Sequence, residues 1–487
     1  MCGVIGLIGT SQASSRALRG LSLLQHRGQD AAGILSYDDS GFHYVRNLGL
    51  VENVFTPENM APLTGEVAIG HVRYGTAGKS ELRNVQPFLL NFPYGIGLVH
   101  NGNLVNFRSL TQELRTKYQR QPLADSDTEN IINLFAEGLA KNVQKRTPTF
   151  DDLCESVDFV FEKAIGSYSI VTLVAGFGLV AFRDPYGLRP LVMGKRREES
   201  GKMSYAIASE STALSFLNYD EFEDIKPGEI VAINMEGMVE RRQLLAREHR
   251  PCMFEWVYFA SPTSEIEGSP VYKARIELGK KMAASVKERM AKDEIEFDVV
   301  VPVPETARIA AIALAEELKV PYREVLIKNR YITRTFILDS QDKREQAVHL
   351  KLAPVLSEIK DKRVLLVDDS IVRGTTSRKL IELVRLAGAK EVYFAATCPP
   401  IKHPCYYGID FPMENELIAN NKSLSGVEAE LGADGVIYQE VEALKEALFP
   451  EKKITPCMAC LTGQYPTATE GVKELVKTRN EDRSAYK

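Results

Sequence analysis

The sequence predicts two domains of different fold class: a layered α+β domain, then an α/β domain built on a parallel sheet. The chain has 487 residues, which is more than one hydrophobic core usually organises. Short strand-like runs broken by glycine fill the first half, whereas apolar runs alternate with helical stretches after about residue 295. Charged residues cluster between the two patterns, around 235–251, and mark the boundary.

The first half has the periodicity of short strands interleaved with a few amphipathic helices. Strands are expected at 3–9, 32–37, 67–72, 95–99, 168–183 and 203–208, and helices at 12–25, 128–144 and 150–165. Clustered strands with few helices favour largely antiparallel sheets layered with helices.

The second half carries near-continuous runs of β-branched and apolar residues at 297–303, 364–369 and 391–398. Such runs, each followed by a helical stretch, are typical of parallel strands that are buried on both faces. We therefore expect four units along the chain: an N-terminal domain at 2–235, a linker at 236–258, an α/β domain at 259–450 and a tail at 451–487.

Composition and charge exclude several classes of protein. The net charge is −5 with both signs mixed, so no basic surface for nucleic acid is expected. No apolar run reaches the roughly 18 residues of a membrane span, and the apolar N-terminus lacks the basic region of a signal peptide. The seven cysteines are too sparse for a disulfide scaffold, which favours catalysis or metal binding in the cytoplasm.

One segment of the second half, VLLVDDSIVRGTTSRK at 364–379, predicts an anion-binding site. An apolar strand ends in Asp368 and Asp369, and Gly374 then opens a helix. Backbone N–H groups at a helix N-terminus bind phosphate, and glycine lets the backbone approach it closely. The carboxylates instead suit ribose hydroxyls and Mg²⁺. Taken alone, either the two acids or the stretch from Gly374 to Ser377 would also fit a solvated turn.

The chain begins with Met1 and Cys2, and a residue as small as cysteine normally permits removal of the methionine. The free α-amino group of Cys2, with an ordinary pKa near 8, then serves as base for its own thiol. This pair alone is a weak signal. Four further segments strengthen it: QHRGQDAAG at 25–33, GHVRYGT at 70–76, HNGN at 100–103 and SDTE at 126–129.

Together these segments resemble the class II, or N-terminal nucleophile (Ntn), glutamine amidotransferases. The resemblance implies that Cys2 is the nucleophile, that Arg73 binds the glutamine carboxylate and that Asp127 binds its ammonium group. Asn101 and Gly102 would form the oxyanion hole. Taken singly, these residues also fit a surface ion pair, a hairpin turn or a helix cap. The nearby histidines are expected to be structural, because the amine is the base: His26, His71 and His100.

The segment at 364–379 resembles the motif with which type I phosphoribosyltransferases bind phosphoribosyl pyrophosphate (PRPP). The resemblance implies that Asp368 and Asp369 bind the ribose and Mg²⁺, with Thr306 contributing to the metal site. The 5′-phosphate would be bound by Ser370, Gly374, Thr375, Thr376 and Ser377. The segment at 328–337 resembles a mobile loop that closes over PRPP, with Lys328, Arg330 and Arg334 offsetting pyrophosphate charge.

The two halves together resemble the glutamine PRPP amidotransferases, from Cys2 to about Pro466. This family implies an enzyme that hydrolyses glutamine and passes ammonia through a dry passage to PRPP, giving phosphoribosylamine in the first step of purine synthesis. It also implies a homo-oligomer, a dimer or tetramer, inhibited by purine nucleotides. His349 stands where the family has another basic residue. The rivals are a different glutaminase-fused synthase and a PRPP-sensing regulator without catalysis.

The cysteines suggest a second metal site. Cys457 and Cys460 form a CxxC, a moderate metal signal. With the segments around Cys252 and Cys405, this tail resembles the branch of the family that carries an iron–sulfur cluster, which implies a [4Fe–4S] cluster on these four cysteines. Zinc on the same four sulfurs is the alternative. The remaining two cysteines, Cys154 and Cys398, are expected to be core thiols.

Overall fold

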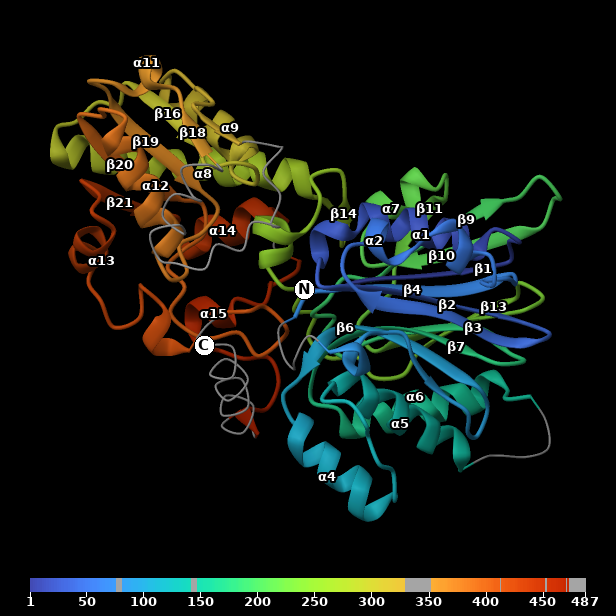
Figure 1. Ribbon diagram of the computed structural model, residues 1–487. Helices are drawn as coiled ribbons and strands as arrows, with labels where there is room; N and C mark the ends of the chain where they lie inside the picture. The colour runs from blue at the N-terminus through green and yellow to red at the C-terminus, as the bar shows by residue number, and fades with distance from the viewer. Residues whose placement is uncertain are drawn as a thin grey trace.

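The computed structural model describes residues 1–75, 81–141, 147–328, 352–411, 413–451, 453–469 and 471–472. The chain forms two lobes, one dominated by strands and one by helices around a smaller sheet (Figure 1). The N-terminus lies at the junction of the lobes. The residues Arg330, Arg334 and His349, for which the sequence predicted or questioned roles, lie outside the described residues.

The N-terminal domain contains two antiparallel sheets. The first has the order β11-β9-β10-β1-β4-β2-β3 and the second the order β13-β12-β8-β7-β6-β5. Their bounds are β1 (Gly3–Ile8), β2 (Ala31–Asp38), β3 (Gly41–Leu48), β4 (Val67–Arg73), β5 (Phe88–Leu90), β6 (Ile96–Leu104), β7 (Gly166–Val174), β8 (Gly178–Arg183), β9 (Val192–Arg197), β10 (Met203–Ala208), β11 (Asp220–Asp224), β12 (Glu229–Asn234) and β13 (Val239–Gln243). Apolar side chains of both sheets, among them Val4, Ile8, Val99 and Val171, meet in a fully buried core.

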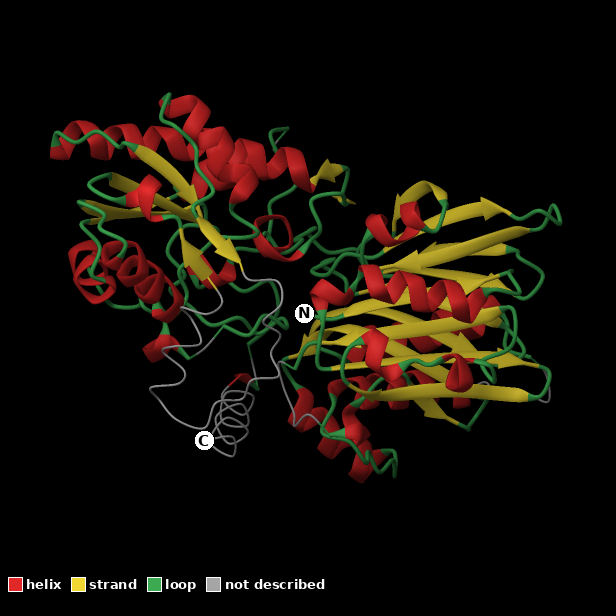
Figure 2. Cartoon of the chain, turned by 45° about the horizontal axis from the view of Figure 1, so that its top comes forward, coloured by secondary structure: helices red, strands yellow, loops and turns green. Residues whose placement is uncertain are grey.

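Helices cover the outer faces of both sheets, so the domain has four layers (Figure 2). Helices α1 (Ala13–Leu23), α2 (Val51–Val54), α3 (Pro57–Met60) and α7 (Ser211–Phe216) belong to the first sheet's side. Helices α4 (Phe107–Lys117), α5 (Asp127–Ala140) and α6 (Phe150–Lys163) belong to the second's. A capping box between Thr149 and Asp152 starts α6, as is common at helix N-termini. The predicted antiparallel, layered domain is confirmed.

The C-terminal domain is built on a four-stranded parallel sheet of order β16-β19-β20-β21. Its strands are β16 (Val299–Pro302), β19 (Arg363–Asp368), β20 (Glu391–Ala396) and β21 (Gly435–Tyr438). The surrounding helices are α8 (Val271–Asp293), α9 (Arg308–Leu318), α11 (Leu356–Ile359), α12 (Thr375–Leu386), α13 (Leu424–Leu431) and α14 (Val441–Leu448), and an antiparallel pair, β17 (Leu326–Lys328) and β18 (Leu352–Pro354), completes the domain. The valines and leucines of β16 and β19 are buried, which confirms the α/β prediction.

A linker and the C-terminal tail meet between the domains. The linker contains a π-helical turn, η3 (Glu255–Phe259), followed by a small hairpin, β14 (Glu265–Ile266) and β15 (Ser269–Pro270). Cys252 forms a β-bridge with Cys457 of the tail. The described part of the tail contains the short helix α15 (Ala459–Thr462). Because β13 pairs with β12, the N-terminal sheet extends past residue 235. In the described part of the chain, no helix is long and apolar enough to cross a membrane.

Candidate functional site

Cys2 lies directly before β1, a strand in the middle of the first sheet. Gly3 pairs with Val72 of β4, which brings Cys2 beside the end of that strand. The backbone N–H of Cys2 donates to Oδ1 of Asn101 (3.2 Å), and its Sγ lies 3.9 Å from the carbonyl oxygen of Tyr74. The sheet register therefore brings together three of the segments that the sequence singled out.

Asn101 and Gly102 lie on β6, the strand of the second sheet that passes this cysteine. Nδ2 of Asn101 is buried and has no hydrogen-bond partner among the described residues, which is costly for a donor unless a ligand uses it. A Cβ on Gly102 would lie 2.0 Å from the carbonyl oxygen of Ser167, so only glycine fits. An unsatisfied donor on a side chain that also binds the backbone of Cys2 is suited to an oxyanion hole.

Arg73 and Asp127 lie on separate elements of the N-terminal domain. Arg73 ends β4 and is buried. Its carbonyl accepts from the N–H of Asp30 (3.0 Å), and Gly28 of the same QHRGQDAAG segment lets the two backbones approach closely. Asp127 opens α5 and accepts from the N–H of Leu104 (3.0 Å). Burial opposes its ionisation, but the neighbouring His100 and backbone N–H groups lower the pKa of Asp127. It is therefore a carboxylate, as an ammonium-binding group must be.

Two of the three histidines, His26 and His100, make hydrogen bonds away from Cys2. His26 Nε2 lies 2.8 Å from Glu210, and His100 Nδ1 lies 3.2 Å from the hydroxyl of Thr128. Burial lowers the pKa of His71 well below its ordinary value, so that ring is neutral. Among the described residues, no hydrogen bond joins any of the three to Cys2, which agrees with a structural role.

The predicted phosphate loop lies at the carboxyl edge of the parallel sheet, where α/β proteins bind ligands. β19 runs between β16 and β20, and the loop after it turns at Gly374, whose φ of 74° favours glycine. A Cβ there would lie 2.4 Å from Ile418. Helix α12 then starts without a side-chain cap, which leaves its first N–H groups available to an anion.

The two acids at the end of β19 differ in their surroundings. Both oxygens of Asp369 accept hydroxyls, from Thr306 (2.5 Å) and Ser370 (2.7 Å), whereas Asp368 accepts from the N–H of Asp369 (2.9 Å). Burial, and then the adjacent Asp369, raise the pKa of Asp368 well above its ordinary value. Two desolvated carboxyls and a hydroxyl are hard oxygen donors, so this set fits Mg²⁺, which restores the charged form.

A cavity of about 780 Å³ connects this loop with the N-terminal domain. It is lined by the predicted residues Thr306, Asp368, Asp369, Ser370, Gly374, Thr375, Thr376 and Ser377, and also by Tyr74 from beside Cys2 and by Phe254, Tyr258 and Phe259 of the linker. Lys328 lies at the exposed end of β17 and is not among the described residues that line the cavity.

The four cysteines of the expected cluster are buried in one hydrophobic core that joins the linker, the tail and the C-terminal domain. Burial, and then the neighbouring Cys398, Cys405, Cys252 and Cys457, raise the pKa of the Cys460 thiol well above its ordinary value. Among the described residues, no three or more His, Cys, Asp or Glu side chains are arranged to hold a metal. The donor chemistry fits a soft metal site, although the thiols here are not gathered as ligands.

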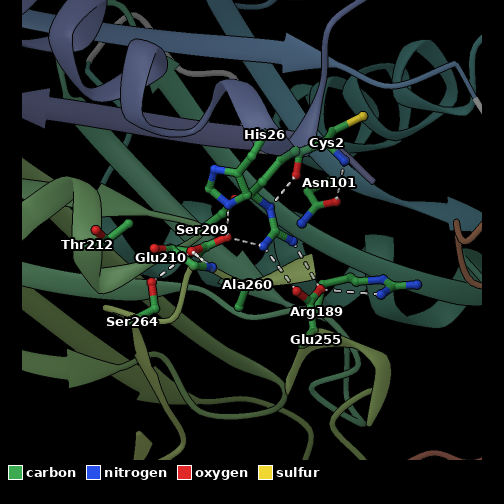
Figure 3. Close-up of polar contacts among 12 residues, drawn as sticks. Cys2, His26, Asn101, Arg189, Ser209, Glu210, Thr212, Glu255, Ala260 and Ser264 are labelled. Carbon is green, nitrogen blue, oxygen red and sulfur yellow. Dashed lines mark hydrogen bonds and ion pairs between the residues drawn. The ribbon is translucent and has the colours of Figure 1, made fainter. Parts of the chain in front are cut away.

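Sequence reasoning missed a set of buried charges near Cys2: Arg27, Arg189, Glu210 and Glu255. Figure 3 labels the last three of them. Only Arg27 could have been noticed in the sequence, because it lies in the QHRGQDAAG segment. The other three lie outside every recognised motif, so only the fold brings them together. Cys398 was expected as a core thiol and is buried, but its neighbourhood with Cys460 was not foreseen.

Two family models match the chain, a glutamine amidotransferase domain over residues 77–216 and a phosphoribosyl transferase domain over residues 272–410. The amidophosphoribosyltransferase of Pseudomonas aeruginosa is 45% identical and covers 92% of this chain and 89% of its own length. The glutamine PRPP amidotransferase of B. subtilis, solved with ADP and GMP, has a TM-score of 0.84 at 37% identity, covering 96% of this chain and 98% of its own. A solved allosteric regulatory enzyme of purine biosynthesis has a TM-score of 0.85 at 37% identity, with 96% and 97% covered. By its sequence and its fold alike, the chain belongs to the amidophosphoribosyltransferase family.

Proposed function

We propose that Cys2 is the nucleophile and the Asp368–Ser377 loop the PRPP site of this glutamine PRPP amidotransferase, an enzyme of the first step of purine biosynthesis. The observation that carries this assignment is the position of Tyr74. Its carbonyl oxygen lies 3.9 Å from Cys2 Sγ, and Tyr74 also lines the cavity around the loop that follows β19. The nucleophile therefore lies beside a residue of the proposed PRPP cavity, which supports transfer of ammonia from one site to the other.

In the first half-reaction, the α-amino group of Cys2, freed by removal of Met1, takes the thiol proton. Sulfur attacks the amide carbon, and the oxyanion is stabilised by Asn101 Nδ2 and the N–H of Gly102. Collapse expels ammonia, which carries the proton away, and water hydrolyses the thioester to glutamate.

In the second half-reaction, the lone pair of ammonia forms a bond to ribose C1 as the bond to pyrophosphate breaks. Asp368 would hold the ribose hydroxyls, and the N–H groups and hydroxyls of Gly374–Ser377 would hold the 5′-phosphate. Mg²⁺ bound at Asp368, Asp369 and Thr306 would neutralise the charge of the departing pyrophosphate. Phe254, Tyr258 and Phe259 line the same cavity and would help to exclude water, which protects neutral ammonia.

The test is the coupling of the two half-reactions, measured with glutamine, PRPP and Mg²⁺. We expect glutamate and pyrophosphate in equal amounts. Arg73→Ala should raise the KM for glutamine roughly 10- to 100-fold, because a charge-assisted contact contributes about 1.5–3 kcal/mol, and should leave synthesis from added ammonia intact. Loss of both activities in this variant would contradict the assignment of Arg73 to glutamine.

We also propose that Cys252, Cys405, Cys457 and Cys460 bind a [4Fe–4S] cluster. The support is their burial in one core, the β-bridge between Cys252 and Cys457, and the hydrogen bonds by which Lys402 and His403 hold the carbonyl of Cys460 (3.0 and 2.9 Å). The buried cation of Arg189 opposes the effect of burial on the pKa of the Cys252 thiol. When bound, the cluster would tie the linker and tail to the C-terminal domain.

Anaerobically purified protein should contain about four iron and four sulfide per chain. Cys457→Ser should lose the iron and lower the Tm, because a metal that binds only the folded state stabilises it. Cys398→Ala is the matched control and should retain the iron, since Cys398 is assigned to the core. Colourless protein with one equivalent of zinc would show that the four cysteines bind zinc instead of the cluster. Active protein without metal would exclude both metal sites.

The remaining parts of the proposal concern organisation and regulation. A relative solved with ADP and GMP supports inhibition by purine nucleotides, and we retain a cytoplasmic homo-oligomer, dimer or tetramer, as the expected form. We divide the chain as expected from the sequence, except that the first unit ends after β13 rather than at residue 235. The linker, the C-terminal domain to residue 450 and the cysteine-bearing tail follow.

A further inference from the structure

Four buried charged side chains, the Arg27 cluster, lie between Cys2 and the linker. Arg27 precedes β2, Arg189 precedes β9, Glu210 precedes α7, and Glu255 begins the π-helical turn η3 of the linker. Their side chains are at most 1% exposed. Figure 3 shows the cluster beside Cys2 and Asn101. Nothing in the chemistry proposed above uses these charges, yet burying them is costly unless each is paired.

Arg27 connects the cluster to the nucleophile. Its Nε donates to the backbone carbonyl of Cys2 (2.9 Å). Its terminal nitrogens donate to Glu210 (2.5 Å) and to both oxygens of Glu255 (3.0 Å each). Because a guanidinium is a planar fork, two carboxylates bound to it fix its orientation. The position of the Cys2 carbonyl is therefore set by where Glu210 and Glu255 lie.

Glu255 is itself held from the other domain. Arg275 of α8 donates to the carbonyls of Trp256 (2.9 Å), Tyr258 (3.1 Å) and Ala260 (2.8 Å), so it clamps the turn that carries Glu255. π-Helical turns are rare and frequently mark functional positions. Tyr258 and Phe259 of the same turn line the PRPP cavity. One short segment thus contacts both sites.

We propose that Glu255 is a positioning residue for the glutaminase reaction: it orients Arg27, which fixes the backbone of Cys2 so that thiol and amine stay aligned with Asn101. The inference rests on the proposed role of Cys2 as nucleophile. It also means that the sheets of the N-terminal domain do not complete the glutaminase site. A carboxylate from the linker, anchored to the C-terminal domain, is part of the support.

A glutamine at position 255 would break this support. Its amide has one acceptor oxygen where the carboxylate has two, and its NH₂ group would face the buried donors of Arg27 and Arg189. Arg27 would then keep its bond to Glu210 but only one of its two bonds to residue 255, and the Cys2 carbonyl would shift with it. Misplacing a reacting group by about 1 Å costs on the order of 100-fold in rate.

Glu255→Gln in the full chain tests the inference. The kcat for glutamine-dependent synthesis should fall roughly 10- to 100-fold, with the KM for glutamine and the rate with added ammonia unchanged. Glu198→Gln is the matched control. Glu198 pairs in the same bidentate way with Arg16 of the N-terminal domain (2.5 and 2.8 Å), but neither residue contacts the site, so kcat should stay at the wild-type value.

Unchanged kcat in Glu255→Gln overturns the proposal, and so does an equal loss of the ammonia reaction, which reports general damage. If that variant fails to fold, Arg27→Lys decides. Lysine keeps the charge but cannot reach the Cys2 carbonyl and both carboxylates at once, so kcat should fall alike. Full kcat, or a second failure to fold, assigns the cluster to stability alone. A wild-type enzyme that releases no glutamate refutes the proposed function instead.

Discussion

Cys2→Ala should lower glutamine-dependent synthesis by at least about 10⁴-fold, the size of effect seen when a covalent nucleophile is removed. Alanine keeps the backbone contacts of Cys2, to Asn101 (3.2 Å) and from Arg27 (2.9 Å), so the neighbouring site stays in place. Synthesis from added ammonia should be unchanged, because the proposed PRPP loop belongs to the other domain. Both rates are measured as pyrophosphate release with saturating PRPP and Mg²⁺.

Cys154→Ala is the matched control for this variant. Cys154 lies on α6 in the core beneath the second sheet, and burial raises the pKa of its thiol to about 11, which keeps it protonated and unreactive. Removing its sulfur should create a small cavity in the core and should leave the glutamine-dependent and ammonia-dependent rates unchanged. Wild-type glutamine hydrolysis by Cys2→Ala would exclude Cys2 as the nucleophile.

The fold class was predictable because the core strands carry period-two or continuous apolar patterns that survive in the structure. β1, β4, β10, β16, β19 and β20 lie within two residues of their expected bounds. The edge strands were missed for a physical reason. β11, with the sequence DEFED, is mostly exposed, so neighbouring strands rather than its own propensity make it a strand. The expected strand at 168–183 is a hairpin that turns at Gly176, where φ is 76°.

Long-range contacts were the part that the sequence could not supply. Segments with local chemical signatures, such as the acids before Gly374 or the residues around Asn101, could be recognised alone. The Arg27 cluster as a whole has no such signature. Glu255 and Arg27 are separated by 228 positions, and only Arg27 lies in a recognised segment, whereas its partners look like ordinary surface charges in the sequence. Similarly, only the fold shows that Tyr74 lies beside Cys2 and also lines the cavity around the loop after β19.

Asp368→Asn should lower kcat/KM for PRPP roughly 10³-fold in both the glutamine and the ammonia reactions. Asp368 is the acid of the pair with acceptor capacity to spare, because Asp369 already accepts Thr306 and Ser370. Two charge-assisted hydrogen bonds to ribose hydroxyls at about 1.5–3 kcal/mol each account for a loss of this size. An amide also supplies no charge to Mg²⁺, so the concentration of Mg²⁺ needed for half-maximal rate should rise.

The matched control is Asp434→Asn at the opposite edge of the same sheet. Asp434 accepts from the N–H of Val392 (2.6 Å) and from Arg385 (2.8 Å), just before β21, so its loss should lower the Tm and leave PRPP kinetics unchanged. The two variants separate binding from stability, because both replace one carboxylate of the same domain by an amide. Wild-type kcat/KM for PRPP in Asp368→Asn would show that the loop after β19 is an ordinary turn and that other side chains of the cavity bind the ribose.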